Sequence, residues 1–460
     1  MAANLSSRSD RFKQGKAMRK AVPRTAHADL TGDLTRDPVA ILAQNDSARV
    51  EELLPVRYQR MTTDAFAFLR GSAAVMANDL VSQPMVGIPV QACGDCHLMN
   101  FGAFGTPEDN ILFDINDFDE TLPGVDFTVD VKRLAASVAV AALAAGLPRS
   151  RARALATSTV SGYHARMYDL AGLSPLVIWH SRVELADEIA RMGDRGLKRK
   201  LTDIVARTRG QLENDDNFPK LVTGSTPRID DKPPTIFHLD AKLDAKHKLK
   251  PDLLFEQYAA GLDPSVAMLL SRYDLADFVF KAVGVGSVGT FCGVGLFMSG
   301  DNDPLFLQVK QAAASVLECL SPKLSFKGDQ GRRVVEGQRI MQSASDIFLG
   351  VAQDQKTGRD FYVRQLKNRR LGGVSELAEA SALEDYGRLC GRTLARAHAK
   401  SGDPAMIAGY IGKGDAFADA VGSFALAYAD QTAKDYAALV VAKPTKVAEP
   451  AKVLKLQKKA

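Results

Sequence analysis

Two short polar segments constrain this chain more than any other part of its sequence. Residues 93–100 read Cys-Gly-Asp-Cys-His-Leu-Met-Asn, and residues 113–119 read Phe-Asp-Ile-Asn-Asp-Phe-Asp. Apolar runs on both sides of a turn at 105–109 favour two antiparallel strands, which would bring the second segment beside the first. One hairpin is therefore expected to carry a cluster of acidic and amide side chains.

This hairpin has the chemistry of a magnesium site. Mg²⁺ prefers carboxylate, amide and water oxygens, and a transferring phosphoryl group gathers negative charge that cations must offset. We expect Asp95 to hold an acceptor hydroxyl as the catalytic base, with Asn100 and Asp117 as metal ligands. The alternative is a polar, solvated loop that binds no ligand.

A glycine-rich segment later in the chain points to phosphate as well. The strand-like residues 277–283 run into a G-x-G-x-x-G pattern formed with Gly284, Gly286, Ser287 and Gly289. Its glycines would let backbone amides approach a phosphate closely. A dinucleotide-binding fold would need a helix directly after the third glycine, but the chain continues with strand-like residues. The segment is therefore predicted to be a loop between two strands that covers phosphates.

Lys310 is predicted to lie at the end of the strand over 305–310 and to bind phosphates. A helix over 331–342 could bring Glu336 to the lysine as an ion-pair partner, and Glu318 is the rival. An exposed lysine at a strand end is the alternative for Lys310. The strands expected for this sheet span 277–283, 290–297, 305–310, 347–351 and 361–366.

These segments resemble the protein kinase-like superfamily, closest to the aminoglycoside and choline kinases, whose catalytic loop has the form Gly-Asp-x-His-x-x-Asn. The resemblance implies ATP and Mg²⁺ as cofactors, the glycine loop over the phosphates and Lys310 on the α- and β-phosphates. It also implies that His97 orients the loop through a hydrogen bond. Because the spacing is longer than in that superfamily, Asp114 or Asp119 could replace Asp117 as metal ligand.

The whole chain, from Arg8 to His398, also resembles an uncharacterised bacterial domain family with a Gly-Asp-x-His-x-x-Asn-Phe-Gly signature. Kinases place the glycine loop and lysine before the catalytic loop, whereas here Asp95 comes first. We therefore expect a two-lobed α+β kinase-like fold in circularly permuted order, which termini close together would tolerate.

The chain has 460 residues, more than a single hydrophobic core typically holds, so two lobes are expected. Its 46% of hydrophobic residues is ordinary for a globular enzyme. A mainly helical lobe is expected over 1–270, a β-rich nucleotide lobe over 271–370, C-terminal helices on the first lobe over 371–441, and a disordered basic tail over 442–460. The net charge of +5 lies partly in that tail, and without a basic face interleaved with aromatics we expect no nucleic-acid partner.

Helices are expected at several further places. Arg70 lies at a break in the helix expected over 63–80 and could face a phosphate, although a solvated helix face is the default for arginine. His398 ends the inner stripe of the last and is expected to pack in the core. The expected helices span 63–80, 134–147, 150–171, 182–209 and 376–400.

The start of the chain lacks an apolar leader, and the apolar run at 134–147 is too short to cross a bilayer, so a cytoplasmic protein without a membrane partner is expected. Cys93-x-x-Cys96-His97 also satisfies the attachment pattern of c-type haem, which would make the protein an electron carrier. Haem attachment of this kind belongs to exported proteins, so the lack of an apolar leader argues against this alternative. Zinc would need a second cysteine pair, and the other three cysteines are scattered.

The sequence therefore predicts an ATP- and magnesium-dependent phosphotransferase. The step from Asp117 to the following helix is too short for a long activation segment, which favours a small-molecule acceptor over a protein. A catalytically inactive nucleotide-binding protein and a nucleotidyltransferase remain as alternatives. The sequence does not define the acceptor or the oligomeric state.

Overall fold

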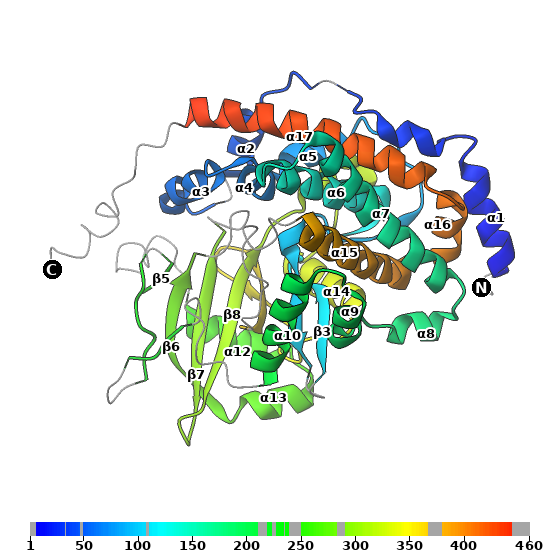
Figure 1. Cartoon of the computed structure of the whole chain (residues 1–460). Helices are drawn as coiled ribbons and strands as arrows, with labels where there is room; N and C mark the ends of the chain where they lie inside the picture. Colours follow the sequence, from blue (N-terminus) through cyan, green and yellow to red (C-terminus); the bar gives the residue numbers. More distant parts are fainter. Residues whose placement is uncertain are drawn as a thin grey trace.

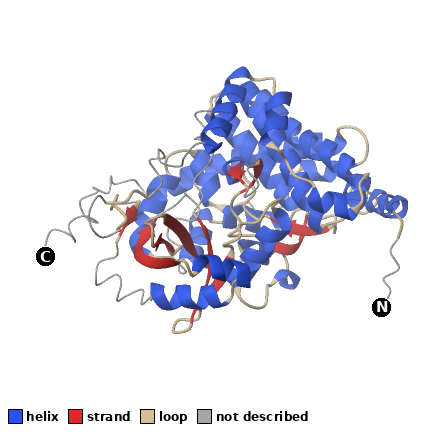
Figure 2. Ribbon diagram, turned by 90° about the horizontal axis from the view of Figure 1, so that it is seen from below, coloured by secondary structure: helices blue, strands red, loops and turns tan. Residues whose placement is uncertain are grey.

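A computed structural model describes most of the chain. The described residues are 6–32, 34–46, 49–106, 110–209, 219–222, 227–233, 235–238, 250–282, 290–366 and 380–443. The structure combines helices with antiparallel sheets, as expected for the α+β class. Figure 1 shows one large sheet at one side of the molecule and most helices stacked beyond it. Figure 2, turned by 90°, shows the large strands together at one side and shorter strands among the helices.

The large sheet has six strands in the order β5-β6-β7-β8-β10-β9, and every neighbouring pair is antiparallel. Aromatic and aliphatic side chains such as Phe280, Phe291, Leu307 and Phe361 form its core, which Leu53 joins from the N-terminal region. The strands are β5 (Ile236–Phe237), β6 (Tyr273–Lys281), β7 (Cys292–Ser299), β8 (Pro304–Ala312), β9 (Gly350–Asp354) and β10 (Arg359–Gln365).

Two small antiparallel pairs lie within the helical part. Strand β1 (Pro89–Ala92) pairs with β4 (Leu122–Asp126), and β2 (Phe101–Gly105) pairs with β3 (Ile111–Ile115). The turn η3 (Leu98–Asn100) leads directly into β2. This is the hairpin predicted from the sequence, and the whole acidic segment lies between β1 and β4.

Helix α6 (Thr128–Ala144) is the centre of the helical core. Its residues from Thr128 to Ala142 are all buried, as for a helix surrounded by protein on every side. Lys132 is buried as well, and its Nζ lies 4.7 Å from the centre of the Phe424 ring. Within the described residues this ammonium has no hydrogen-bond partner.

Long helices pack around α6. Helices α7 and α15 approach closely because small residues line their contact: a Cβ added to Gly391 would lie 2.3 Å from the Thr159 carbonyl oxygen. Figure 1 shows α17 running along the side of the molecule away from the sheet. These three helices are α7 (Arg149–Ala171), α15 (Ala380–Ser401) and α17 (Ala416–Ala442).

The remaining helices complete the two regions. Those of the N-terminal part are α1 (Arg8–Met18), α2 (Pro38–Asp46), α3 (Leu54–Met61), α4 (Ala65–Gly71) and α5 (Ala73–Leu80). The others are α8 (Pro175–His180), α9 (Leu185–Arg191), α10 (Arg195–Arg209), α12 (Pro251–Ala260), α13 (Pro264–Leu270), α14 (Gln330–Met341) and α16 (Pro404–Ile411). None of the helices within the described residues has the length and apolar character needed to span a bilayer.

The strands expected for the large sheet are all present, with shifted ends. The helix expected over 63–80 has the break expected near Arg70, because α4 ends at Gly71 and Ser72, with a φ of −119° and a ψ of 38°, is not helical. One helix prediction needs correction. The helix expected over 182–209 is two helices, α9 and α10, because the chain is non-helical between Arg191 and Arg195. The basic tail expected over 442–460 lies outside the described residues from position 444 on.

Candidate active site

The loop that follows β1 is fixed by a buried carboxylate from α6. Asp130 accepts hydrogen bonds from the backbone N–H groups of Cys93, at 2.6 Å, and Gly94, at 3.0 Å. His398 of α15 holds the same carboxylate at 3.1 Å, and its other ring nitrogen lies 3.0 Å from the Tyr163 hydroxyl. His398 is fully buried, as expected, and it acts here as a support of the loop.

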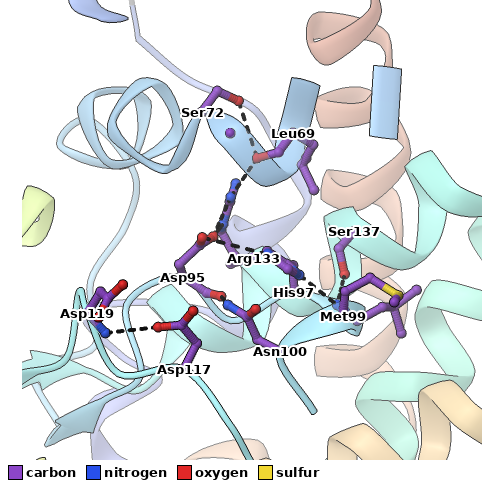
Figure 3. Close-up of polar contacts among 12 residues, drawn as sticks. Leu69, Ser72, Asp95, His97, Met99, Asn100, Asp117, Asp119, Arg133 and Ser137 are labelled. Carbon is purple, nitrogen blue, oxygen red and sulfur yellow. Dashed lines mark hydrogen bonds and ion pairs between the residues drawn. The ribbon is translucent and has the colours of Figure 1, made fainter. Parts of the chain in front are cut away.

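Asp95 projects from this loop toward a buried arginine that sequence reasoning missed. Nε and Nη2 of Arg133 lie 2.8 Å and 2.5 Å from Asp95 Oδ1, and Nη2 also donates to the Leu69 carbonyl at 2.7 Å (Figure 3). The second oxygen, Oδ2, lies 3.7 Å from His97 Nε2. Burial raises the pKa of the Asp95 carboxyl above its ordinary value, and the Asp117 charge adds to this, although Arg133 opposes it.

His97 and Asn100 keep the loop in shape. The ring nitrogen Nδ1 of His97 accepts the backbone N–H of Met99 at 3.1 Å, and Asn100 Nδ2 donates to the Asp95 carbonyl at 2.7 Å. The backbone N–H of Asn116 donates to the Asn100 carbonyl at 2.8 Å. The end of β3 is thereby tied to the start of β2, which places the following acidic residues beside the loop.

Asp117 lies next to Asn100 and on the same side of the loop (Figure 3). Its Oδ1 accepts the backbone N–H of Asp119 at 3.2 Å and lies 3.8 Å from Lys310 Nζ. Within the described residues, Asn100 Oδ1 and Asp117 Oδ2 make no hydrogen bond. Both oxygens suit a hard cation, so these two residues fit the predicted metal-ligand pair.

In the described part of the chain, no three or more His, Cys, Asp or Glu side chains gather closely enough to hold a metal ion on their own. A metal ion held by Asn100 and Asp117 would therefore need further ligands from water or substrate.

Asp114 does not fit the metal role that the sequence allowed it. Its carboxylate is fully buried and lies 2.5 Å from Arg396 Nη2 of α15. The other oxygen accepts the backbone N–H and hydroxyl of Ser343 at 2.9 Å and 2.6 Å. Asp114 therefore links β3 to α15 and to the end of α14.

Lys310 of β8 reaches across to the acidic hairpin, from which it is separated by 191 positions in the sequence. Its Nζ lies 2.8 Å from Asp119 Oδ2, and the Tyr362 hydroxyl donates to the other oxygen of the same carboxylate. Burial alone would lower the pKa of Lys310, but the charges of Asp117 and Asp119 raise it well above its ordinary value. Burial would likewise raise the pKa of Asp119, and Lys310 reverses this.

The ion-pair partner predicted for Lys310 was wrong. Glu336 lies on the outer side of α14, half exposed, and pairs with Arg332 one turn away at 2.7 Å. The rival, Glu318, accepts the backbone N–H of Phe326 at 3.4 Å. The position beside the lysine is taken by Asp119, which the sequence had offered only as a substitute metal ligand.

A second cation lies near Lys310 on the sheet. Arg364 of β10 donates to the Asn116 carbonyl at 3.0 Å and to the Gln308 side chain at 3.1 Å. Gln308 and Lys310 are two residues apart on β8 and face the same side, and β10 places Arg364 opposite Gln308. Sequence reasoning missed Arg364, because neither its spacing nor its neighbours distinguish it from a surface arginine.

The glycine segment with Gly284, Gly286, Ser287 and Gly289 lies outside the described residues. The two thiols of the C-x-x-C-H pattern, Cys93 and Cys96, are free and buried in the helical core. Contact with Cys96 and burial raise the pKa of the Cys93 thiol, and burial raises that of Cys96 to about 11. Buried, protonated thiols give the haem alternative no support.

Fold and site together define an α+β protein in which an acidic hairpin on a helical body faces a lysine-bearing antiparallel sheet. The chain belongs to a family of uncharacterised proteins conserved in bacteria (DUF2252), whose family profile matches residues 49–442. This confirms the predicted resemblance to a bacterial domain family. Neither the curated proteins nor the solved structures contain a significant match to the chain.

Proposed function

We propose that this protein is an ATP- and magnesium-dependent phosphotransferase with kinase-like parts in circularly permuted order. The observation that carries the proposal is the contact between Lys310 and Asp119, with Asp117 close by. A permuted kinase requires its early acidic hairpin to meet its late strand lysine across one site. No interaction between sequence neighbours requires these two segments to come together.

Asp95 is the proposed base for the acceptor hydroxyl. Arg133 engages only Oδ1, so Oδ2 is the oxygen that can accept a hydrogen bond from substrate. The raised pKa of this carboxyl increases its basicity, while the buried arginine keeps it oriented. A base held in one orientation loses little entropy when the acceptor binds.

Asn100 and Asp117 are the proposed magnesium ligands. A bound Mg²⁺ would offset charge on the transferred phosphoryl group. Lys310 and Arg364, on the sheet opposite, would hold the nucleotide phosphates, together with the glycine segment at 284–289. Asp119 has the role that a helix glutamate has in kinases, because it positions the lysine.

The acceptor is proposed to be a small molecule. Only a short segment with β4 separates Asp117 from α6, so the chain has no long segment after the metal ligand on which a protein substrate could dock. Transfer of a nucleotidyl group and nucleotide binding without turnover are the competing functions, and both keep the same ATP site.

The test is binding and turnover with purified protein. Thermal shift and calorimetry with Mg²⁺ and a non-hydrolysable ATP analogue should show binding that Lys310→Met abolishes, while Asp252→Asn, an exposed change on α12, has no effect. Turnover of radiolabelled ATP against a pool of small hydroxyl compounds should be lost in Asp95→Asn with analogue binding kept. Absence of nucleotide binding by the wild-type protein would refute the proposal.

The roles of the two carboxylates can be separated in the same assays. Asp119→Asn should weaken nucleotide binding, because Lys310 loses its partner, whereas Asp117→Asn should abolish the magnesium dependence of that binding. Glu336→Gln should behave like the wild type, since Glu336 pairs with Arg332. The mass of the product distinguishes phosphoryl from nucleotidyl transfer.

A further inference from the structure

Helix α14 contacts both the large sheet and the turn at 119–121. A Cβ added to Gly331 would lie 2.3 Å from the Phe361 carbonyl oxygen of β10, and one added to Gly337 would lie 2.5 Å from Thr121 Cγ2. A larger residue at either glycine would push the helix away from its neighbour. One helix thus packs closely against both parts of the molecule that form the proposed site.

Arg333 of α14 connects these two parts through one side chain, which is almost completely buried. Nη1 donates to the Thr121 carbonyl, and Nη2 donates to the carbonyls of Asp119, at 2.9 Å, and Ala313, at 2.6 Å. Nε donates to the Gln330 side chain at 2.7 Å. Since a guanidinium is planar and its donors are fixed relative to one another, these carbonyls are held in one arrangement.

The three carbonyls lie on the two sides of the ion pair between Lys310 and Asp119. Asp119 and Thr121 belong to the turn, whereas Ala313 directly follows β8, three residues after Lys310. The ion pair itself joins Nζ and Oδ2 at 2.8 Å. Moving either backbone segment would separate the two charges, so Arg333 holds them at this distance. Helix α14 therefore acts on the lysine through its arginine, and not through the glutamate that the sequence suggested.

A second set of hydrogen bonds joins the turn to the segment after β8 without help from α14. The Ser315 hydroxyl donates to the Glu120 carbonyl at 2.7 Å, and the backbone N–H of Val316 donates to the Glu120 carboxylate at 2.7 Å. Because these bonds do not depend on Arg333, the two segments should stay together when it is replaced. Such a change is expected to alter the exact position of Asp119 and not the fold.

We propose that Arg333 is a positioning residue of the nucleotide site. By holding the backbone on both sides of the ion pair, it sets the position of the Lys310 ammonium and thereby the affinity for nucleotide phosphates. Lysine could not replace it, because an ammonium is a point charge on a flexible stem and cannot reach all three carbonyls at once. This inference rests on the proposed function, because the site that Arg333 positions is the proposed nucleotide site.

Chemical labelling of Lys310 tests the positioning without any nucleotide. Acetic anhydride acetylates accessible amines, and peptide mass spectrometry gives the rate for each lysine. Lys310 should react slowly in the wild-type protein, since it is 2% exposed and paired with Asp119. Arg333→Lys should raise its rate by roughly tenfold, because losing one charged hydrogen bond shifts a local equilibrium by about that factor.

Two further variants accompany this measurement. Gln330→Met is the milder change, because it removes only the acceptor of Nε, and it should raise the rate of Lys310 by less. It also provides the test should Arg333→Lys not fold, which circular dichroism detects. Arg339→Lys is the matched control: it loses a hydrogen bond of 2.7 Å from the same helix to the Leu349 carbonyl, away from the turn, and Lys310 should react as in the wild type.

Calorimetry with Mg²⁺ and the non-hydrolysable ATP analogue gives the functional readout. Arg333→Lys should weaken analogue binding by roughly tenfold, and Arg339→Lys should leave it unchanged. Arg333→Lys combined with Asp119→Asn should bind no more weakly than the weaker single variant, because both changes act through the position of Lys310. An arginine with a merely structural role would give losses that add.

The outcomes separate this inference from the proposed function. If Lys310 reacts in Arg333→Lys and Gln330→Met as slowly as in the wild type, or if the losses in the double variant add, the positioning role is wrong and the proposed function stands wherever the analogue binds. If Lys310 reacts faster in both variants but the wild-type protein binds no analogue, the proposed function fails, and Arg333 remains the residue that positions Lys310.

Discussion

Replacing Lys132 by methionine should stabilise the protein, and more so as the pH falls. Lys132 is about 1% exposed near the start of α6, and its ammonium has the Phe424 ring but no hydrogen-bond acceptor within the described residues. Burial lowers its pKa from 10.5 to about 7, and Asp126 opposes this only in part. Methionine fills a similar volume without a charge.

The sign follows from proton binding. Between about pH 7 and the unfolded value of 10.5, the unfolded chain binds more protons at Lys132 than the folded chain, so wild-type stability rises with pH in this window. Below the folded pKa both states are protonated, and the full penalty applies. The pKa of Lys132 in the folded chain is lower than that in the unfolded chain by about 3.5 units, which corresponds to a loss of stability of about 5 kcal/mol at about 1.36 kcal/mol per unit.

Urea unfolding of wild type and Lys132→Met at about pH 7 and pH 9 measures this effect. We expect the variant to be more stable than the wild type at both pH values. The difference between their free energies of unfolding should be smaller by about 2 kcal/mol at the higher pH. Lys434→Met, an exposed change on α17, should show no such pH dependence. The reasoning is refuted if the gap stays constant between the two pH values, or if Lys132→Met is the less stable protein at neutral pH.

Three further results are expected. Arg396→Met leaves the buried Asp114 carboxylate without its cation, so the free energy of unfolding in urea should fall by about 3–5 kcal/mol. Adding Asp114→Asn to this variant should restore part of the lost stability, because it removes the unpaired charge. Gly94→Ala should lower both melting temperature and turnover, because Gly94 has a φ of +90° and the new Cβ would lie 2.2 Å from the Glu120 carbonyl oxygen. Because the pKa of Asp95 is raised, turnover should fall on acidification at a pH above the ordinary value of 3.8, and a limb at or below 3.8 in the pH–rate profile would contradict the assignment of the base.

The local elements of this protein were predictable because their signals are local. Apolar, strand-like runs between turns indicated β6, β7, β8 and β10, and the apolar runs around a turn indicated the hairpin of β2 and β3. Turn and strand preferences act over a few residues. Asp95, Asn100 and Asp117 could therefore be placed together from their spacing alone.

The partners of charged residues were not predictable in the same way. Whether Lys310 pairs with Asp119 or with Glu336 depends on how α14 is rotated against the sheet, and no short pattern encodes that rotation. Asp114 was indistinguishable from its acidic neighbours until the fold brought Arg396 to it from 282 positions away. Arg133 offered a signal, because a charge near the start of an apolar helix is favoured when a partner pairs with it, but the adjacent Lys132 carries the same signal and has no hydrogen-bond partner among the described residues.

The hydrogen bonds from His398 to Asp130, and from Arg396 to Asp114, have a consequence for biosynthesis. The loop with Asp95 leaves the ribosome early, yet the helix that clamps it is translated more than 250 residues later, since His398 and Asp130 are 268 positions apart. A nascent chain that stops before α15 would carry the acidic hairpin without its clamp. The proposed nucleotide binding should therefore arise only after α15 has been translated, and a deletion that removes α15 should abolish it although the acidic hairpin itself is intact.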